Sequence, residues 1–419
     1  MGGCVRDSLL GKEPKDWDIC TSALPEKTQK IFSGHHIIET GLQHGTITLM
    51  LNHKPFEITT YRVDGVYSDN RRPDKVEFVS SLKEDLSRRD FTINAMAYNP
   101  EKNIADFFGG VTDLQNKIIR CVGDADRRFG EDALRIMRAL RFSSTLDFSI
   151  SEDTSKAIFR NKELLKNISV ERISVELNKL LTGINPADVL DFYTEIITVI
   201  IPEIKDTVGF KQNNKWHYLD VWQHTLKSVI SAPNDIILRL VMLFHDIGKP
   251  CCYTEDNEKN GHFYRHPQVS HDMAKIILKH LKYDNATIDN VLKLILYHDA
   301  EIKPQNKSIK RWLKKIGEEK LRQLLDVKRA DNKAQNLKLT EEQLKILDRI
   351  EIMLNEIILQ NQCFSLKDLK VNGRDLIDFG IPEGVSIGLI LNQLVDMVID
   401  ELIENDREKL LEAAKNIKI

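Results

Sequence analysis

The pattern of apolar and polar residues changes character along the chain. Residues 1–120 contain short runs rich in β-branched residues, separated by Gly, Asn and Asp, and such runs predict strands joined by turns. These runs are Ile37–Glu39, Ile47–Leu51, Phe56–Tyr61 and Val76–Phe78. From about Asp124 to Ile204, apolar residues recur every third or fourth position, which is typical of amphipathic helices. The pattern predicts an α/β head followed by a helical neck.

Beyond the neck, the sequence turns polar around Lys205–Trp216, and histidines then become frequent. They are His217, His224, His245, His262, His266, His271, His280 and His298. This clustering predicts a separate helical module, and a charged tail rich in Leu and Ile follows it. We expect an α+β fold, with a small mixed sheet in the head and helices elsewhere. The expected domains are a head at 1–123, a neck at 124–204, a histidine-rich domain at 205–335 and a tail at 336–419.

Composition limits the classes of partner. The 419 residues include 60 basic and 63 acidic side chains, so any surface for nucleic acid must be a local patch. The six cysteines show no C-x-x-C spacing, which fits a reducing compartment and gives no sign of structural zinc. Apolar runs stay well short of the ~20 residues of a membrane span, and no secretion signal is recognisable. We therefore expect a cytoplasmic protein with no membrane association.

The first chemical motif is a glycine turn followed by two acids. Gly2 and Gly3 begin the run Gly-Gly-Cys-Val-Arg-Asp, which ends with Arg6 and Asp7. Glycines allow backbone N–H groups to approach phosphate oxygens closely. All four of these residues are therefore assigned to the binding of a nucleotide triphosphate.

The two acids stand in Asp16-Trp17-Asp18. In an extended strand Asp16 and Asp18 share one face and can hold hard cations, with Trp17 packed behind. Glu57 lies in a β-branched run that could form a neighbouring strand and add a third carboxylate; it could equally be a solvated strand residue. Two Mg²⁺ ions held by these acids would activate a 3′-hydroxyl and neutralise a triphosphate.

A second motif places two arginines beside an acid. Arg88, Arg89, Asp90 and Asn94 lie in the run Arg-Arg-Asp-Phe-Thr-Ile-Asn, and arginine forks suit phosphate or sugar oxygens. Alternatively, Asp90 is a helix cap flanked by solvated arginines. The polar segment Asp64–Pro73 between the motifs has the composition of a flexible lid, and also that of an ordinary loop.

The neck carries a possible base-reading pair. The run Glu-Asp-Ala-Leu-Arg is expected to begin a helix, which places Asp132 and Arg135 on one face. Cytosine and adenine both present an amino donor beside a ring-nitrogen acceptor, so a carboxylate and a guanidinium would select them and reject uracil and guanine. The alternative is an intrahelical salt bridge. Arg138 and Arg141 continue the row from Arg135, either as phosphate contacts or as solvated side chains.

Together, these motifs resemble the class II bacterial CCA-adding tRNA nucleotidyltransferases of the polymerase-β-like superfamily. The resemblance runs from Gly2 to about Leu181 and implies a polymerase-β-like head. It also implies that the Arg-Arg-Asp element binds the nucleotide sugar and phosphates, and that Glu131, Asp132 and Arg135 read the base. It adds a linking element, Asp124 with Arg128, and a helix-stabilising element from Glu171-Arg172 to Glu176.

The beginning of the chain departs from this family. Family members normally have a helix, and a strand ending in Val, before the two glycines, whereas this sequence begins at Met1. GTG encodes Val internally but is read as Met at a start. We therefore expect the assigned start to lie inside a longer gene, which the intact mass of the native protein would test.

The histidine-rich domain resembles the HD-domain phosphohydrolases, through the doublet His245-Asp246. His and Asp side chains from several helices readily form a divalent-metal site. The resemblance assigns the ligands His224, His245, Asp246, His266, His298 and Asp331, and His262, His271 and Asp326 compete for the last three positions. It implies Mn²⁺, Ni²⁺ or Fe²⁺ and hydrolysis of phosphoesters, including 2′,3′-cyclic phosphates; the domain could also be only a structural unit.

The predicted function is the addition of C, C and A to the 3′ end of tRNA, from CTP and ATP and with release of pyrophosphate. Alternatives are a CC-adding or A-adding enzyme, a poly(A) polymerase, an HD phosphohydrolase whose head senses nucleotide, and a tRNA-binding protein without catalysis. The lid-like segment argues against CC-only addition, since the resemblance suggests that CC-adding enzymes lack it. Residues 401–419 contain five acids and four bases, so they form no basic extension of the poly(A)-polymerase kind. The sequence leaves the oligomeric state open.

Overall fold

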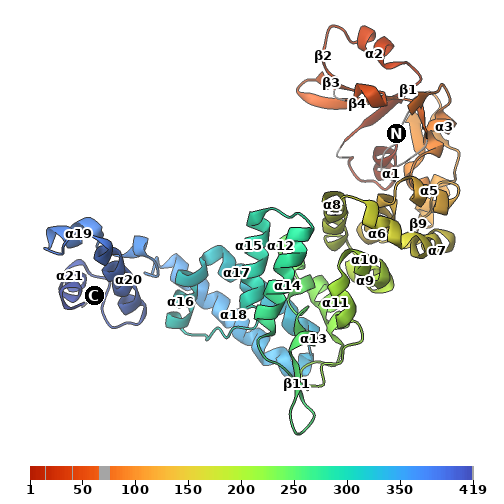
Figure 1. The fold of residues 1–419 in the computed structure, drawn as a ribbon. Helices are drawn as coiled ribbons and strands as arrows, with labels where there is room; N and C mark the ends of the chain where they lie inside the picture. Colours follow the sequence, from red (N-terminus) through yellow and green to blue (C-terminus); the bar gives the residue numbers. More distant parts are fainter. Residues whose placement is uncertain (15, 40, 66–75, 418–419) are drawn as a thin grey trace. The chain divides into compact units, whose positions relative to one another are not determined.

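The structure is a computed structural model that describes residues 1–14, 16–39, 41–65 and 76–417 (Figure 1). It divides into two compact units. The first comprises Met1–Lys205 and Ile277–Tyr283, and the second comprises Asp206–Ile276 and Asp284–Ile419. The finer division into four domains stays a prediction.

The head contains the expected small mixed sheet. Its strands are β1 (Asp18–Thr21), β2 (His36–Ile38), β3 (Thr46–Leu51) and β4 (Lys54–Thr60), in the spatial order β1-β4-β3-β2. Strand β1 is parallel to β4, and the other pairs are antiparallel. The buried side chains of Ile47, Leu49 and Ile58 form its core, and α2 (Pro25–Ile31) contacts β3. Three of the predicted runs therefore correspond to β2, β3 and β4, whereas β1 was expected only from the acid motif.

The rest of the head places the nucleotide motifs beside this sheet. Its elements are α1 (Gly3–Leu9), β5 (Arg62–Asp64), β6 (Val76–Phe78), α3 (Leu82–Ser87), η2 (Thr92–Asn94), β7 (Met96–Asn99), β8 (Asn103–Asp106), α4 (Gly110–Gln115) and β9 (Ile118–Ile119). Helix α1 packs against η2 and β7. A core that includes Met1, Leu86 and Ala95 joins these elements. The glycine turn before α1 is thus anchored from several sides.

The neck is helical, as the three-to-four spacing predicted. Its elements are α5 (Ala125–Glu131), α6 (Leu134–Leu146), β10 (Ser149–Ile150), α7 (Glu152–Asn161), η3 (Lys162–Asn167), α8 (Val170–Leu181), α9 (Pro186–Phe192), α10 (Thr194–Ile200) and η4 (Pro202–Thr207). Helix α6 packs most extensively on α8, where Met137, Leu140, Leu177 and Leu180 are fully buried. This packing fixes the direction in which the arginines of α6 project.

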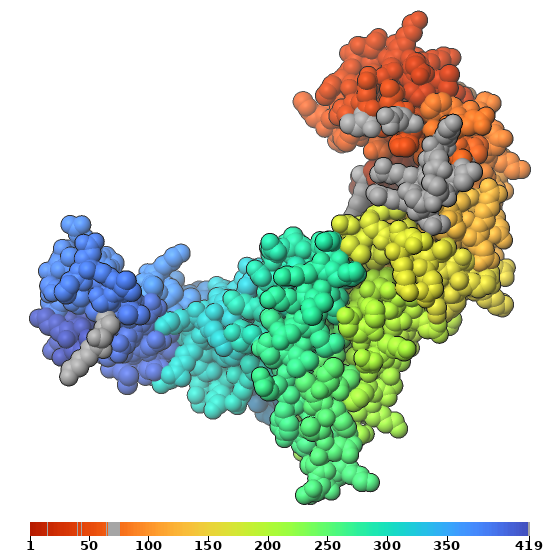
Figure 2. All heavy atoms as spheres, in the orientation of Figure 1, coloured from red at the N-terminus to blue at the C-terminus, as the bar shows by residue number. Residues whose placement is uncertain are grey.

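The second unit is almost entirely helical. Its elements are α11 (Val221–Ser231), α12 (Ile236–Phe244), α13 (Lys249–Cys252), β11 (Tyr253–Glu255), β12 (Gly261–Phe263), α14 (His266–His280), α15 (Asn285–Tyr297), α16 (Asn306–Ile316), α17 (Glu318–Ala334), α18 (Leu337–Leu359), η5 (Leu366–Asp368), α19 (Gly373–Asp378), α20 (Val385–Ile399) and α21 (Arg407–Asn416). Helices α11, α12, α15 and α17 pack on one another. The β11–β12 hairpin projects from these helices (Figures 1 and 2). Among the helices of the described ranges, none has the length and apolar character needed to cross a bilayer.

Candidate active site and candidate metal centre

The glycine turn holds Gly2 in a conformation that other residues rarely adopt. Its φ is +79°, and a Cβ atom there would occupy the position of Arg89 Nη1. Its N–H donates to the Met96 carbonyl at 2.9 Å, and the nitrogen of Met1 donates to the Asp18 carbonyl at 2.7 Å. The turn therefore lies directly beside the acid strand and beside an arginine of the second motif. Gly2 is needed for the close approach of Arg89 as well as for its backbone angle.

The structure places two of the three predicted acids side by side. Asp18 and Glu57 are paired residues on the parallel strands β1 and β4, so the neighbouring strand expected for Glu57 is confirmed. Asp16 lies in a bend before β1 begins, so the expectation that Asp16 and Asp18 share one strand face is wrong. Trp17 is 53% exposed rather than packed behind the acids. The chain has no strand partner for this segment in the described residues and bends toward solvent.

These carboxylates suit cations. Within the described residues, the side chains of Asp16, Asp18 and Glu57 have no hydrogen bond or ion pair, and all three are at least partly exposed. Adjacent like charges on one sheet face repel each other. A divalent cation bound between them removes that repulsion, and the carboxylate oxygens serve as its ligands. The three acids do not form a group as close as the histidine groups described below. Asp18 and Glu57 are thus the better-placed pair, and Asp16 lies in the exposed bend that precedes them.

Arginines of the head have internal partners. Arg6 binds Asp7 through Nε at 2.8 Å and Nη2 at 2.7 Å, and donates from Nη1 to Asn94 Oδ1 at 2.6 Å. Arg88 Nη2 lies 2.9 Å from Asp85 Oδ1, and Arg89 Nη2 lies 4.0 Å from Asp85 Oδ2. Neither Arg88 nor Arg89 is fully solvated, so the solvated-arginine alternative does not describe them.

Asp90 links this motif to the neck. Arg138 donates to its Oδ2 from Nε at 2.8 Å and from Nη2 at 2.6 Å, and Asn94 donates to its Oδ1 at 3.1 Å. Burial by itself raises the pKa of Asp90, but the charge of Arg138 and these hydrogen bonds hold that pKa well below its usual range. Asp90 is also not the side-chain cap of η2, whose N-cap is Phe91. It is a buried anion that orients the groups around it.

The base-reading pair is arranged differently from the sequence prediction. Helix α5 ends at Glu131, Asp132 is extended, and α6 begins at Leu134, so Asp132 and Arg135 do not share one helix face. Asp132 Oδ1 accepts from the Leu134 N–H at 3.1 Å, and Oδ2 accepts from Arg172 Nη2 at 2.9 Å. The alternative, a salt bridge between Asp132 and Arg135, is also not found among the described residues. The helix breaks because the Asp132 side chain replaces a backbone acceptor.

Arg135 is held by groups other than Asp132. Its Nη1 donates to Glu131 Oε2 at 2.8 Å and to the Arg128 carbonyl at 3.1 Å, and its Nη2 donates to the Arg88 carbonyl at 2.9 Å. Glu131 therefore orients the arginine. Within the described residues, Arg135 keeps unbound N–H groups, and each Asp132 oxygen keeps acceptor capacity for a base.

The remaining predicted neck residues also have partners within the protein. Arg141 Nε lies 2.7 Å from Glu176 Oε2, and Arg138 Nη1 lies 4.0 Å from Glu176 Oε1. Asp124 caps α5 by accepting from the Arg127 N–H at 2.7 Å. Of the expected lid, residues 66–73 lie outside the described residues.

In the second unit, the structure brings all six predicted ligands together. His224 comes from α11, His266 from α14 and Asp331 from α17, whereas His245-Asp246 and His298 directly follow α12 and α15. His224 Nε2 lies 3.0 Å from Asp331 Oδ1 and 3.3 Å from His245 Nε2. His266 Nε2 lies 3.1 Å from His298 Nε2. Five of the six members are buried and Asp331 is partly exposed, although the six are scattered over more than 100 residues of sequence.

The ring orientations suit metal binding. The Nδ1 atoms of His245, His266 and His298 lie 2.7 to 2.8 Å from the carbonyls of Met242, Phe263 and Ile295, so these nitrogens carry the hydrogen. In the neutral ring each Nε2 then carries a lone pair that faces the cluster and can bind a metal. Burial, reinforced by His245 and His266, lowers the pKa of His298 to about 3, which keeps that ring neutral.

Asp246 joins two groups of possible ligands. Its Oδ2 lies 3.3 Å from both His224 Nε2 and His245 Nε2, and its Oδ1 lies 3.4 Å from His266 Nε2. Both oxygens are buried without a hydrogen bond, although Lys249 Nζ forms an ion pair with Oδ2 at 2.6 Å. Such an acceptor-rich, buried group fits a divalent cation.

Three competing residues have other partners. His262 pairs with Asp256 at 3.0 Å, His271 with Asp272 at 2.7 Å, and Asp326 with Arg329 at 3.6 Å. His217, which was not predicted as a ligand, forms a possible ligand group with His224 and Asp331. Its position at the end of the polar stretch before α11 was the available signal.

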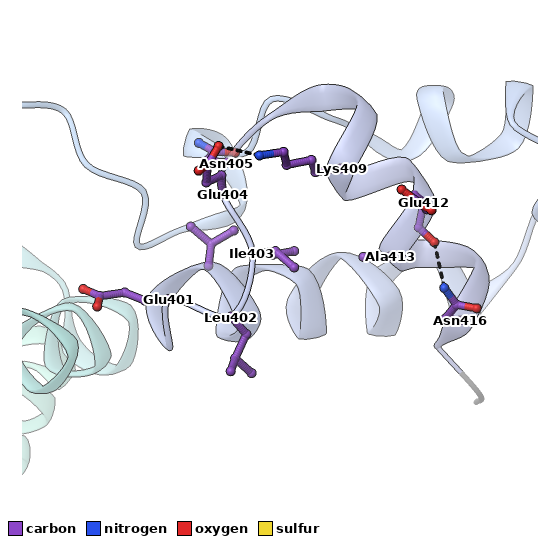
Figure 3. Close-up of a pocket in the computed structure, with 10 residues that line it drawn as sticks. Glu401, Leu402, Ile403, Glu404, Asn405, Lys409, Glu412, Ala413 and Asn416 are labelled. Atoms are coloured by element: carbon purple, nitrogen blue, oxygen red, sulfur yellow. Dashed lines mark hydrogen bonds and ion pairs between the residues drawn. The ribbon is translucent and has the colours of Figure 1, made fainter.

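A cavity of about 720 Å³ opens beside the cluster. Lys215, Arg265 and Lys249 line it together with the aromatic residues Trp216 and Tyr264, a lining that suits a phosphate ester with an aromatic group. A pocket in the tail differs: Glu401, Glu404 and Glu412 line it, with Lys409 as its cation (Figure 3). The acidic tail pocket is therefore unsuited to phosphate.

Comparison with known proteins identifies the family to which this architecture belongs. The Poly A polymerase head domain family matches residues 1–120, the probable RNA and SrmB-binding site of polymerase A matches 147–207, and the putative tRNA nucleotidyltransferase domain 2 matches 262–414. The fold and the head site thus define a tRNA nucleotidyltransferase with a polymerase-β-like head. The chain is 36% identical over its full length to the CCA-adding enzyme of Ligilactobacillus salivarius, covering 92% of that protein. It is 34% identical to the CCA-adding enzyme of Pediococcus pentosaceus, covering 93% of it. The chain belongs to the CCA-adding enzyme family.

Solved structures agree with this membership. The CCA-adding enzyme of Bacillus stearothermophilus in complex with CTP matches 99% of this chain and 91% of its own, with 29% identity and a TM-score of 0.74. The Thermotoga maritima CCA-adding enzyme complexed with tRNA, at 21% identity and a TM-score of 0.62, shares the fold. Membership of this class implies a divalent metal. Within the described residues, the histidine cluster contains groups close enough together to bind one, and the carboxylates of Asp16, Asp18 and Glu57 are further oxygen donors.

Proposed function

We propose that this protein adds C, C and A to the 3′ end of tRNA, using CTP and ATP and releasing pyrophosphate, in the cytoplasm. The observation that carries the proposal is the pairing of Asp18 with Glu57 beside the Gly2 turn. Membership of the CCA-adding enzyme family supports it. The three carboxylates would hold Mg²⁺, which supplies charge neutralisation and activates the 3′-hydroxyl.

The chain's own residues would then divide the remaining work. Arg6 and Arg89 would bind the triphosphate near Gly2, since Arg6 keeps unbound N–H groups on Nη1 and Nη2 within the described residues. Asp132 would accept from the amino group of C or A, and Arg135 would donate to the adjacent ring nitrogen. Arg172 and Glu131 would hold these two readers in place.

The test uses three tRNAs, ending before CCA, after C and after CC, each with CTP and ATP supplied separately. The expected products are C addition to the first two and A addition to the third, with no incorporation of U or G. Sequencing of the products distinguishes CCA addition from CC-only, A-only and poly(A) activity. An extension of several A residues on the third tRNA would contradict the proposal.

A second function rests on the histidine cluster. We propose that the six ligands bind Mn²⁺, Ni²⁺ or Fe²⁺ and that this centre hydrolyses a phosphoester, because Asp246 presents buried oxygens toward both groups of histidines. The test measures hydrolysis of bis-p-nitrophenyl phosphate and of 2′,3′-cyclic AMP with each metal, in the wild-type protein and in His245→Ala. Hydrolysis that survives unchanged in His245→Ala would contradict this assignment. If neither protein hydrolyses either ester, the cluster is a structural unit.

A further inference from the structure

The aromatic ring of Phe142 in α6 contacts three guanidinium groups. The Cζ atoms of Arg141, Arg6 and Arg138 lie 3.6, 5.0 and 5.5 Å from the ring centroid. All three lie within the roughly 6 Å at which a cation interacts with the face of an aromatic ring. Phe91 meets the same ring edge-on, at 5.8 Å and 84°, which fixes the plane of the ring. Phe142 is 4% exposed, so these contacts are largely shielded from water.

The three arginines come from different parts of the nucleotide site. Arg6 lies in α1, directly after the glycine turn, and Arg138 and Arg141 lie in α6. A hydrogen-bonded chain also joins the two helices: Arg6 donates to Asn94, Asn94 donates to Asp90, and Arg138 donates to Asp90. The guanidinium groups of Arg6 and Arg138, the two ends of this chain, both lie over the Phe142 ring.

The same face of α6 carries the base reader. Phe142 follows Arg135 by seven residues and Arg138 by four, and such spacings place side chains on one side of a helix. Phe142 and Arg135 therefore lie on the same side of α6, about two turns apart. The ring contacts Arg6, the arginine expected at the triphosphate, and shares helix α6 with Arg135, the arginine expected at the base.

The Phe142 ring can attract these arginines and leave their hydrogen-bond donors free, whereas a carboxylate could not. The faces of the ring carry partial negative charge and attract a guanidinium without occupying its N–H groups. Arg6 uses its N–H groups for Asp7 and Asn94 and, within the described residues, keeps others on Nη1 and Nη2. A further carboxylate in place of the ring would take those donors and repel a triphosphate.

We infer that Phe142 is a positioning residue that couples triphosphate binding by Arg6 to base reading by Arg135. The inference rests on the proposed nucleotide-adding function. Phe142 sets the orientation of Arg6 and the place of α6 together, so a correctly bound triphosphate favours the geometry in which only C or A fits.

The test compares Phe142→Leu with Phe148→Leu as a matched control. Phe148 is also buried, at 6% exposure, and within the described residues no cation lies over its ring. Phe142→Leu is expected to raise the KM for both CTP and ATP about tenfold, from the loss of three shielded cation contacts, with a much smaller change in kcat. It should also increase UTP misincorporation relative to CTP, whereas Phe148→Leu should change only the melting temperature. Phe142→Tyr, which keeps the ring face, should restore the KM.

A fluorination series tests the negative ring faces while the shape of the side chain stays nearly the same. Phenylalanine at position 142 is replaced by its mono-, di- and trifluoro analogues, which keep the shape of the ring and progressively weaken its negative faces. The nucleotide KM should rise stepwise along the series. A flat series, or an unchanged KM in folded Phe142→Leu, overturns the inference. Failure of the wild-type protein to add C or A to tRNA would instead reject the proposed function.

Discussion

Arg172 in α8 binds the carboxylate of Asp132, with Nη2 2.9 Å from Oδ2, across 40 residues of sequence. The contact joins the helix-stabilising element to the residue expected to accept the amino group of the incoming base. Because Asp132 lies in an extended link between α5 and α6, no helix backbone holds it. The direction of its carboxylate depends on Arg172 and on the N–H of Leu134.

Arg172→Gln should therefore reduce the selectivity for C and A, although Arg172 itself is not expected to contact the base. We expect UTP and GTP incorporation relative to CTP and ATP to rise about tenfold, as expected for the loss of a charge-assisted hydrogen bond. Single-turnover incorporation of each nucleotide measures this. Arg160→Gln is the matched control, because Arg160 forms a more exposed neck ion pair with Asp126. Equal loss of selectivity in both variants would contradict the role of Arg172.

Asp18→Asn should abolish nucleotide addition but leave tRNA binding intact. Asp18 is paired with Glu57 on the adjacent strand, and an amide there removes one of the charges that would hold the cations. Incorporation of labelled CTP should fall by at least about 10³-fold, while the Kd for tRNA in a filter-binding assay stays within twofold. The control is Glu26→Gln, an exposed acid in α2 of the same head. Substantial turnover by Asp18→Asn would exclude its role as a metal ligand.

The two glycines of the turn should respond differently to alanine. Gly2→Ala forces a residue with a side chain into positive φ and displaces Arg89, so it should destabilise the protein by about 1–3 kcal/mol and raise the nucleotide KM. Gly3 lies in α1, and the nearest atom to a Cβ there is Arg6 Nη2 at 3.7 Å. Gly3→Ala should consequently be neutral in stability to within about 1 kcal/mol. Thermal unfolding and nucleotide titration of both variants test this difference, and similar losses would disprove it.

Asp90 should make stability depend on pH at the acidic end. Its pKa in the folded protein is lower than the ordinary value of about 3.9 expected in the unfolded chain. The ionised form therefore stabilises the fold fully above the unfolded pKa, and this contribution is lost as the pH falls through the folded pKa. In urea unfolding at pH 7, the free energy of unfolding of Asp90→Asn should be lower than that of the wild type by about 2–4 kcal/mol. The difference should shrink below about pH 4; a difference that does not depend on pH would contradict the ionised, paired state.

Substitution of Asp246 should lower the metal content of the protein more than substitution of His298. The two oxygens of Asp246 face both groups of histidines, whereas His298 belongs to one group. After incubation with Mn²⁺ and desalting, Asp246→Asn should retain almost no metal and His298→Ala should retain part of it, as measured by elemental analysis. Both variants should still add nucleotides to tRNA, because the cluster lies in the second unit and Asp18 in the first. Wild-type metal content in Asp246→Asn would reject the cluster as a metal centre.

The sequence by itself determined the elements and the chemical groups. Short runs rich in β-branched residues predicted four strands of the head, β2, β3, β4 and β6. The three-to-four spacing predicted the neck helices, because one face of an amphipathic helix must be buried. The residue types of the glycine turn, the acids and the histidines were readable, since local composition carries that chemistry. The set of four histidines and two aspartates was also assigned by its resemblance, and the structure brings those six side chains together.

Only the tertiary structure decided which groups meet. The sequence did not indicate that Asp16 stands before the strand, that α5 ends at Glu131, or that Arg89 fills the space above Gly2. Asp90 and Arg138 are 48 residues apart, and no spacing rule relates them. Helix packing sets such contacts, because the position of a side chain depends on the crossing of whole elements rather than on its sequence neighbours. The same packing placed three arginines around Phe142, which the sequence had shown only as one more apolar position of α6.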